Sequence, residues 1–526
     1  MPRWKRLLNP ARRYSIFLAP VLLLVTLLAW SVASPVGSSP DEDFHLASIW
    51  CGQGEREGVC EPGATAVEQS VPAPVAGGIC YALESSLSAE CYEERMDAPV
   101  EQMVSTGRGN FTSIYPAGFY WVNSLLVGEN VETSVLAMRA LNAILVVGVL
   151  TALYALLPRS RRNAVALAVT ITLIPLGAFL VASINPSGWA IFAALAVFVG
   201  LSGFFESEGR RRYALGGVTL VAAFMGTGSR ADSAAYVVVA AFSAIFLHWW
   251  RPGTASWWRP VRLRWSDLVA PALVLTMAAA FFFASRQSRA LSSGNTISAA
   301  MEDPTADTPG KLGMGQLLWD NGMNVPSLWA GVFGSWDLGW LDTEMPAFVA
   351  VGGLVVFGAI VFTALPHVTR RDGLVLAGIL GLLWLLPMVL MFRANAPVGG
   401  AVQPRYIMPL MVLLAGVALW RSAVGGRLSR GQLGLMVATL ALANSFAMHN
   451  NIRRYVTGDD VTGFNLNALP EWWWDSAVSP MVVWLVGSAA FAGFLLAIVS
   501  RMGAWDRTPG AGTRAAVPGD EPLTVS

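Results

Sequence analysis

Four ionisable residues follow the first apolar stretch of the chain. Asp41, Glu42 and Asp43 come directly after Pro40 in SSPDEDFHLASIW, and His45 lies four residues after Asp41. Proline and acidic side chains favour the first turn of a helix, and residues four apart share a helix face. These carboxylates are candidates for a general base toward a hydroxyl group. Alternatively, Asp41 and Asp43 bind a divalent cation (Mg²⁺, Mn²⁺ or Ca²⁺), or the segment is an ordinary acidic helix start.

Three arginines lie at or near the ends of apolar stretches. Arg230 is in GTGSRADSAAY, Arg393 follows an apolar run, and Arg405 is in GAVQPRYIMPL. Arginine suits bidentate phosphate recognition, and ionisable residues at membrane depth are candidates for function. We predict phosphate contact first for Arg405, then for Arg230 and Arg393. The alternatives are snorkelling to the interface, or pairing of Arg230 with Asp232.

Two segments combine polar groups with turn-forming or aromatic residues. N-P-S-G at 185–188 predicts a tight turn, with ligand contact by Asn185 as the alternative. The segment 333–343 contains Trp336, Trp340 and Asp342. Its tryptophans are suited either to stacking on a sugar or to anchoring the chain at the membrane interface.

The composition places these residues in a membrane protein. Of 526 residues, 54% are hydrophobic and 13% are charged, and the mean hydropathy is +0.52. Soluble domains are about 25% charged, so this composition excludes a soluble enzyme and a disordered chain. The net charge of +1 excludes the basic surface of a typical nucleic-acid-binding protein.

Apolar runs of about 20 residues predict an all-α polytopic membrane protein with about twelve transmembrane helices. The expected spans are 14–34, 132–157, 164–183, 187–205, 213–228, 231–249, 268–284, 347–365, 374–392, 405–421, 432–448 and 479–500. The aromatic stretch 113–128 is too short and interrupted to span, and it predicts an interfacial helix.

The charges predict the topology. With the N-terminus in the cytoplasm, the inside segments contain 23 of the 35 basic residues and 7 of the 34 acidic residues. Cytoplasmic loops are enriched in Lys and Arg, so the sequence predicts N-in and C-in. Residues 1–500 are then one transmembrane domain with long outside loops at 35–131 and 285–346, and 501–526 is a disordered tail.

All four cysteines lie in the first of these outside loops, where disulfides persist. Four cysteines allow three pairings. Local pairs close the shortest loops, and we favour Cys51 with Cys60 and Cys80 with Cys91. A metal site is the alternative, although the tight C-x2-C spacing is missing.

Five ordered motifs resemble a family of bacterial multi-pass membrane proteins, the domain-of-unknown-function family 2142. The match covers roughly residues 15–450. Its motifs are P-D-E-D-F-H at 40–45, N-P-S-G at 185–188, G-S-R-A-D at 228–232, G-W-L-D-T-E-M-P at 339–346 and Q-P-R-Y-I-M-P at 403–409. Two positions depart from the family pattern. Asp43 stands where proline is usual, which shifts that motif by one residue, and Pro404 stands where glycine is usual.

The resemblance implies an enzyme. The family is similar to the GT-C superfamily of integral membrane glycosyltransferases, which have an acidic pair just after the first helix and use polyprenyl-phosphate or polyprenyl-pyrophosphate sugars. It implies that Asp41 and Glu42 are this catalytic pair, and that Arg405, Tyr406 and Arg230 face the donor phosphate. The other residues expected to contact substrate are His45, Asp43, Asn185, Trp340 and Asp342.

The expected reaction transfers sugar to a cell-envelope glycan or glycolipid on the outer face of the bacterial plasma membrane, by analogy with arabinofuranosyltransferases. Direct displacement inverts the anomeric centre, whereas a retaining route needs a second carboxylate such as Asp43 or Asp342. The rival class is a lipid-linked sugar flippase or secondary transporter, and a non-catalytic scaffold is the third. A carrier keeps its ionisable residues near the midplane, whereas here they cluster at the predicted outer face.

Overall fold

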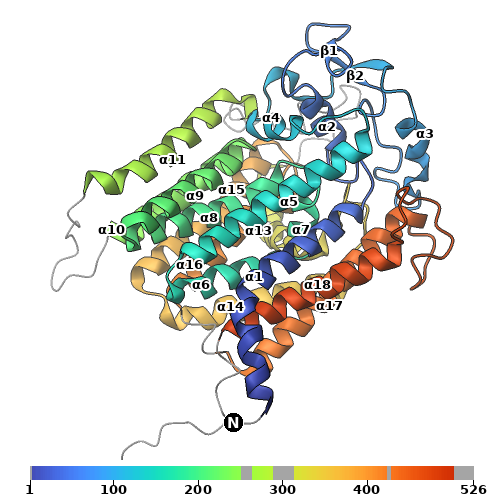
Figure 1. Cartoon of the computed structure of the whole chain (residues 1–526). Coiled ribbons are helices and arrows are strands. Elements are labelled where there is room, and N and C mark those ends of the chain that lie inside the picture. The colour runs from blue at the N-terminus through green and yellow to red at the C-terminus, as the bar shows by residue number, and fades with distance from the viewer. Residues whose placement is uncertain (1–2, 250–263, 288–312, 423–427, 503–526) are drawn as a thin grey trace, which may run out of the picture.

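The computed structural model describes residues 3–249, 264–287, 313–422 and 428–502, with side chains from Phe17 onward, and long helices dominate it (Figure 1). The long helices are α1 (Arg3–Val32), α5 (Val131–Leu156), α8 (Ser187–Glu206), α9 (Gly209–Thr227), α10 (Ala231–Trp249), α11 (Trp265–Ala284), α14 (Ala347–Ala364), α15 (Arg370–Arg393), α16 (Pro404–Trp420), α17 (Arg430–Thr457) and α18 (Pro480–Arg501).

Eight of the described helices are long and apolar enough to cross a membrane: α5, α8, α10, α11, α14 (extended to His367), α15, α17 and α18. The apolar parts of α1 (Phe17–Val32) and α16 are shorter than this criterion. Every expected span overlaps helical structure. The expected number of twelve transmembrane helices is not confirmed, because α9 begins with charged residues and the span expected over 164–183 is interrupted.

The prediction of a single span over 164–183 is wrong. The chain forms α6 (Arg159–Thr170), leaves the helix over 171–175, and then forms the short helix α7 (Leu176–Val181). Pro175 explains the break, because proline lacks the N–H that a continuing helix needs and its ring clashes with the preceding turn. All six residues of α7 are buried, so this short helix lies inside the bundle.

The segment between α1 and α5 folds over one end of the bundle (Figure 1). It contains α2 (Glu42–Trp50), η1 (Ala89–Tyr92), α3 (Glu93–Met96), η2 (Asn110–Thr112), α4 (Gly118–Ser124) and an antiparallel sheet of β1 (Glu61–Pro62), β2 (Gln69–Pro72) and β3 (Met103–Thr106). In its register Ser70 faces Glu61 on one side and Ser105 on the other. We call residues 35–130 the first-loop subdomain.

Two expectations for this subdomain can be checked. Both favoured disulfides form. Cys51–Cys60 joins residues 9 positions apart, and Cys80–Cys91 joins residues 11 positions apart. The range 113–128 predicted for an interfacial helix is longer than the observed helix, because only the residues of α4 are helical there. Ser113 has a φ of 58°, and Pro116 disfavours helical backbone at the residue before it.

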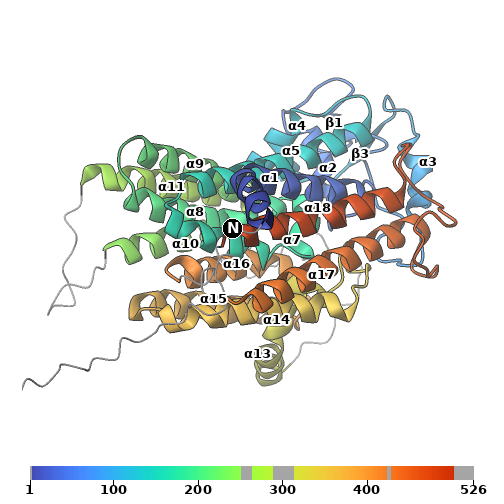
Figure 2. The same cartoon turned by 60° about the horizontal axis from the view of Figure 1, so that its bottom comes forward.

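The predicted loop 285–346 contains helical structure that the hydropathy pattern missed. Residues 288–312 lie outside the described part, and α13 (Met314–Ala330) follows, ending in the π-helical turn η4 (Gly331–Ser335). Figure 2 shows α13 at the edge of the bundle beside α14 and α15. A 3-10 turn, η5 (Leu365–His367), joins α14 to α15. The predicted tail beyond Met502 also lies outside the described residues.

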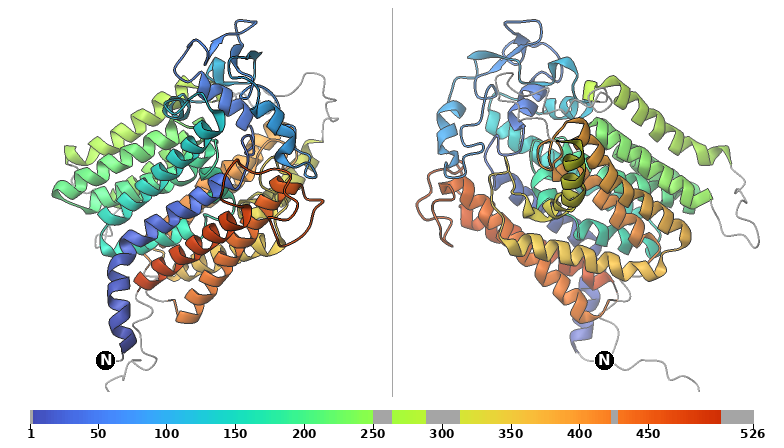
Figure 3. Two further views of the ribbon diagram at one scale, coloured as in Figure 1. Left: turned by 45° about the vertical axis from the view of Figure 1, so that its right-hand side comes forward. Right: turned by 180° about the vertical axis from the view of Figure 1, so that it is seen from behind.

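Helices α1 and α18 run side by side in opposite directions, as the left view of Figure 3 shows. The Cα of Gly487 faces Ala29 and that of Gly493 faces Leu22, so the start of α1 and the end of α18 lie at the same end of the bundle. The first-loop subdomain caps the opposite end.

This close packing predicts that Gly487→Leu destabilises the protein. A Cβ at Gly487 would lie 2.6 Å from Met448 Sδ and 2.8 Å from Ala29 Cβ. We expect a loss of about 1–3 kcal/mol in the free energy of unfolding, because overpacking forces neighbouring helices apart. The measurement is the thermal unfolding of purified protein. Gly358→Leu on α14 is the matched control, since a Cβ there meets nothing within 4 Å. Equal melting temperatures for the two variants would refute the close packing of α18 at Gly487.

Candidate functional site

The acidic motif sits on a sharp change of chain direction. The chain leaves α1 at Val32, and Asp41 precedes the first residue of α2 with φ 60° and ψ 21°, which is the left-handed region. Aspartate adopts this conformation more readily than most residues. Glu42 and Asp43 then occupy the first turn of α2, as expected, and the three carboxylates point to three different arginines.

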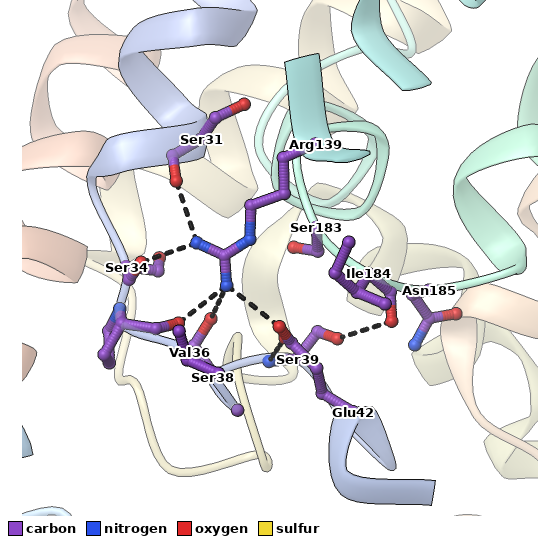
Figure 4. Close-up of polar contacts among 12 residues, drawn as sticks. Ser31, Ser34, Val36, Ser38, Ser39, Glu42, Arg139, Ser183, Ile184 and Asn185 are labelled. Atoms are coloured by element: carbon purple, nitrogen blue, oxygen red, sulfur yellow. Dashed lines mark hydrogen bonds and ion pairs between the residues drawn. The ribbon is translucent and has the colours of Figure 1, made fainter. Parts of the chain in front are cut away.

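Glu42 forms a fully buried ion pair with Arg139 of α5 (Figure 4). Its side chain is 0% exposed; Oε1 lies 3.0 Å from Arg139 Nη2, and Oε2 accepts a hydrogen bond from Ser39 N at 2.9 Å. Arg139 also donates to three carbonyl oxygens at the end of α1 and beyond it, those of Ser31, Ser34 and Pro35, at 2.6–2.8 Å. Both carboxylate oxygens are therefore engaged, and Glu42 serves to fix the backbone that leads to Asp41.

Asp43 pairs with Arg108, which lies between β3 and η2. The Arg108 guanidinium donates to both carboxylate oxygens of Asp43, with Nη2 to Oδ1 at 3.0 Å. The same Nη2 lies 3.6 Å from Asp41 Oδ1. Arg108 thus joins the sheet to the start of α2 and brings a second positive charge to Asp41.

Asp41 is the most exposed of the three carboxylates. Its side chain is 21% exposed, and its Oδ2 accepts a hydrogen bond of 2.8 Å from Arg405 Nη2 at the start of α16. Burial raises the pKa of Asp41, but the positive charges of Arg405 and Arg108 and the proximity of His45 outweigh burial, and the net shift is downward. Asp41 is therefore ionised at neutral pH, which is the form required of a general base.

Arg405 and Arg230 flank one aromatic ring. The Cζ atoms of Arg230 and Arg405 lie 4.6 Å and 5.1 Å from the centroid of the Tyr406 ring, and Arg405 Nη2 donates to the Tyr406 hydroxyl at 3.2 Å. Arg230 also makes a bidentate ion pair with Asp232, both bonds being 2.9 Å. The predicted pairing with Asp232 is thus present, and Arg230 still contributes to a positive region beside Arg405.

Arg405 has unused hydrogen-bonding capacity. The residue is 6% exposed, and its Nε and Nη1 have no hydrogen-bond partner among the described residues. Leaving buried donors unpaired costs about 1–3 kcal/mol each. An anionic oxygen beside the guanidinium would satisfy both donors, so Arg405 is the strongest candidate for binding a phosphate group.

His45 is buried behind Asp41. Its Nδ1 lies 3.0 Å from the Tyr120 hydroxyl, and its ring contacts Phe44, Tyr115 and Tyr120. Burial, together with the positive charges of Arg405, Arg230 and Arg108, lowers the pKa of His45 to about 3 despite the opposing effect of Asp41. His45 is therefore a neutral imidazole at physiological pH and not a cationic phosphate ligand.

Other predicted site residues hold the surrounding backbone. Asn185 donates to Pro40 O at 3.0 Å, directly before Asp41, and its own side-chain oxygen accepts from Ser187 N. Trp340 donates through Nε1 to Gly37 O at 2.9 Å. Asp342 pairs with Arg454 of α17 at 3.0 Å. Arg393 lies exposed at the end of α15.

Three arginines of this site were not predicted from the sequence. Arg139, Arg108 and Arg454 pair with Glu42, Asp43 and Asp342, respectively. Arg139 could have been recognised from its position inside an expected apolar span, because a charged residue there usually has a buried partner. Arg108 and Arg454 lie in polar sequence, so nothing local marks them.

A divalent cation on Asp41 and Asp43 does not fit this geometry. Both carboxylates face Arg108, and Asp41 also faces Arg405, so a cation between them would displace two arginines. Among the residues the structure describes, no group of three or more His, Cys, Asp or Glu side chains is arranged to hold a metal.

A family model described as "Predicted membrane protein (DUF2142)" matches residues 23–414. The matched region begins in α1 and ends in α16, and it therefore contains Asp41, Arg139, Arg230 and Arg405. No curated protein matches the chain.

The buried pair predicts that Arg139→Met costs about 3–5 kcal/mol in the free energy of unfolding, because Glu42 would remain buried without a counter-charge. The double variant Arg139→Met with Glu42→Gln should recover part of this loss. The control is Arg161→Met, whose partly exposed pair with Glu206 is worth at most about 1 kcal/mol. Thermal unfolding of the purified variants measures all three, and additive effects of the two changes would contradict the pairing.

The buried imidazole predicts an acid sensitivity. Below the ordinary His pKa of 6.5 the unfolded chain binds a proton that the folded protein, with its pKa of about 3, does not. Stability is therefore fully present above pH 6.5 and falls by up to about 1.4 kcal/mol per pH unit below it. His45→Gln should flatten the stability curve between pH 6.5 and about pH 3. His449→Gln, at a partly exposed site on α17, is the control. Parallel curves for wild type and His45→Gln would refute the prediction.

Proposed function

This chain belongs to the DUF2142 family of membrane proteins, and we propose that it is an integral membrane glycosyltransferase. In this proposal it moves a sugar from a polyprenyl-phosphate donor to a glycan or glycolipid of the cell envelope. The observation that carries the proposal is the pairing of a partly exposed carboxylate, Asp41, with a buried guanidinium, Arg405, that keeps two donors unpartnered. A base and an anion site 2.8 Å apart suit displacement of a phosphate leaving group by a hydroxyl.

The proposed reaction is a single displacement at the anomeric carbon of the donor sugar. The acceptor hydroxyl oxygen attacks the anomeric carbon, its proton passes to the Asp41 carboxylate, and the bond from the anomeric carbon to the phosphate oxygen breaks. The electron pair leaves with the lipid phosphate, whose charge Arg405 stabilises, with Arg230 nearby. The configuration inverts in this step. The candidates for a second, nucleophilic carboxylate, Asp43 and Asp342, are ion-paired like Asp41, but their side chains are only 4% exposed, which favours inversion over retention.

Donor binding would also raise the proton affinity of the Asp41 carboxylate. In the structure described here, Arg405 Nη2 donates to Asp41, and this contact lowers the pKa of the carboxyl and weakens it as a base. A donor phosphate that binds Arg405 competes for the same guanidinium. The carboxylate of Asp41 then loses part of its stabilisation, and its proton affinity rises when the substrate is in place.

The membrane arrangement in this proposal has about twelve spans, with both termini in the cytoplasm and the first-loop subdomain outside the plasma membrane of a bacterium. The antiparallel contact of α1 with α18 supports placing both termini on one side. The enrichment of Lys and Arg in the connections at that end supports the orientation. The acidic motif then faces the extracytoplasmic side.

A flippase or secondary transporter is the second candidate, since many spans suit a carrier. The distribution of ion pairs favours the transferase. The described pairs lie toward one end or the other of their helices: those with Asp41, Glu42 and Asp342 lie beside the first-loop subdomain, and Arg161–Glu206 and Arg212–Asp267 lie at the opposite end. A carrier would need such groups at mid-depth along its path.

The proposal predicts that Asp41→Asn lowers the rate of sugar transfer at least about a hundredfold. Asparagine tolerates left-handed backbone, so the variant removes the base and keeps the turn. The measurement uses purified protein in lipid nanodiscs with a polyprenyl-phosphate sugar and a glycolipid acceptor. Arg405→Ala should raise the KM for the donor more than that for the acceptor. Exposed Asp475→Asn is the control.

Wild-type transfer by Asp41→Asn would overturn the base assignment, and equal KM changes in Arg405→Ala would remove Arg405 from the phosphate site. Analysis of lipid-linked glycans in a deletion strain separates the two candidate functions. A truncated glycan supports the transferase, whereas a complete glycan retained on the cytoplasmic side supports the flippase.

A further inference from the structure

A cavity of about 460 Å³ lies where the first-loop subdomain meets the end of α11. Sites for small molecules occupy about 300–1,000 Å³, so this cavity is large enough for a ligand. Its walls come from α2, the loop after α2, β2, the segment 110–120 and α11. The backbone N–H groups of residues 286–287 donate to the carbonyl oxygens of residues 113–114 at 2.8 Å, which fixes the chain after α11 to the subdomain.

The walls of this cavity are held in place by the protein itself. The disulfide Cys51–Cys60 closes the loop after α2. Asn110 fixes a second wall: its side-chain amide donates to Tyr115 O at 2.9 Å and accepts from Tyr115 N at 2.7 Å, while its backbone N–H donates to Ser48 Oγ at 2.8 Å. All five residues line the cavity. A ligand therefore meets a pre-formed site, and little free energy of binding is lost to ordering the protein.

Neutral polar groups and aromatic rings share the lining. Gln69 supplies an amide and Ser113 a hydroxyl, and both groups can donate and accept hydrogen bonds. Phe111 and Phe281 add aromatic rings. A saccharide matches this combination, because its hydroxyl groups both donate and accept hydrogen bonds and its C–H faces pack on aromatic rings.

The charge of the lining selects against an anion. Among the described residues that line the cavity, Glu55 is the one charged residue, and it is exposed. A carboxylate repels phosphates, uronic acids and other anions, but it accepts hydrogen bonds from neutral hydroxyl groups. The cavity thus differs from the positively charged region around Arg405 and Arg230, and the ligand that fits it is neutral.

A wall of buried rings separates the cavity from Asp41. Tyr115 and Tyr120 line the cavity, and their ring centroids lie 5.7 Å and 5.9 Å from that of His45. These three residues are at most 3% exposed. Ser48 of the lining lies two turns further along α2 than Asp41, which corresponds to about 10 Å along the helix axis. A ligand in the cavity therefore does not reach the Asp41 carboxylate.

We propose that this cavity binds a short neutral saccharide at a site distinct from the reacting centre at Asp41. The polar groups of Gln69, Ser113 and Glu55 bind its hydroxyl groups, and the aromatic rings cover its C–H faces. The inference goes beyond the proposed function, because it requires no transfer of sugar. In the proposed orientation the first-loop subdomain faces the cell envelope, where neutral glycans are available. A protein with such a site holds a glycan through a unit other than the one that reacts.

The test measures the binding of fluorescent oligosaccharides to the purified full-length protein in lipid nanodiscs. The probes are neutral pentose and hexose oligosaccharides and a second set that carries uronic acids, and we expect binding of a neutral probe only. Ala117→Trp, at an exposed position of the lining, fills the cavity and should raise the Kd of that probe at least about tenfold. Ala66→Trp is the matched control, because Ala66 is an exposed alanine of the same subdomain outside the lining.

Two further variants test the polar groups of the lining. Gln69→Leu keeps the size of the side chain and removes its amide, and the loss of one hydrogen bond should raise the Kd of the neutral probe about three- to tenfold. Gln102→Leu, at an exposed position outside the lining, is the control. Glu55→Gln should leave the neutral probe bound and admit the probes with uronic acids, because it removes the repelling charge.

Four results would overturn the proposal: no binding of any neutral oligosaccharide by the wild type, equal binding of the acidic probes, an equal loss in Ala66→Trp and Ala117→Trp, or unchanged affinity in Gln69→Leu. The outcome is separable from that of the proposed function. Asp41→Asn should bind the neutral probe as the wild type does, and a loss of binding there would reject the separate site. Saccharide binding that responds to Ala117→Trp, in a protein that transfers no sugar, would retain the site and reject the transferase.

Discussion

The buried pair of Arg139 and Glu42 is the constraint on which the rest of the site depends. The end of α1 and the chain after it leave carbonyl groups unpaired by the helix in a buried region, and a single guanidinium satisfies three of them together with the Glu42 carboxylate. Burying two charges brings little net stability, but such a pair selects one backbone path over others. That path fixes Asp41 in left-handed backbone, where its carboxylate meets Arg405.

Apart from Arg230–Asp232, the ion pairs around the site join segments that are far apart in the chain. Arg108 ties the small sheet to α2, Arg405 ties α16 to Asp41, and Arg454 ties α17 to the turn at Asp342. The carboxylates are thus not equivalent, although they are neighbours in sequence. Glu42 and Asp43 are buried against their partners, whereas Asp41 stays partly exposed and Arg405 keeps two donors without a partner among the described residues. The three adjacent acids therefore differ because their partners differ, and not because of their order in the motif.

Hydropathy predicted the positions of the helices, because a helix in lipid must satisfy its backbone internally and be apolar along its length. It failed where a helix lies in protein, as at α7, or is only partly apolar, as at α13. The motifs predicted Asp41, Arg230 and Arg405 as neighbours, and the short loops predicted both disulfides. Their partners were hidden, since contacts between residues 65 to 112 positions apart leave no periodic signal in the sequence.

These separations also set the order in which the molecule is built. Asp41 and Arg405 are 364 residues apart, and Leu87 and Arg454 are 367 apart. During synthesis the first loop leaves the ribosome long before α16 and α17, the helices that carry Arg405 and Arg454. The loop must therefore persist without those partners, and its two disulfides, its small sheet and the Arg108–Asp43 pair all lie within the loop and need neither helix. The contacts of Asp41 and Asp342 are then completed late, when α16 and α17 have been made and only α18 is still to follow.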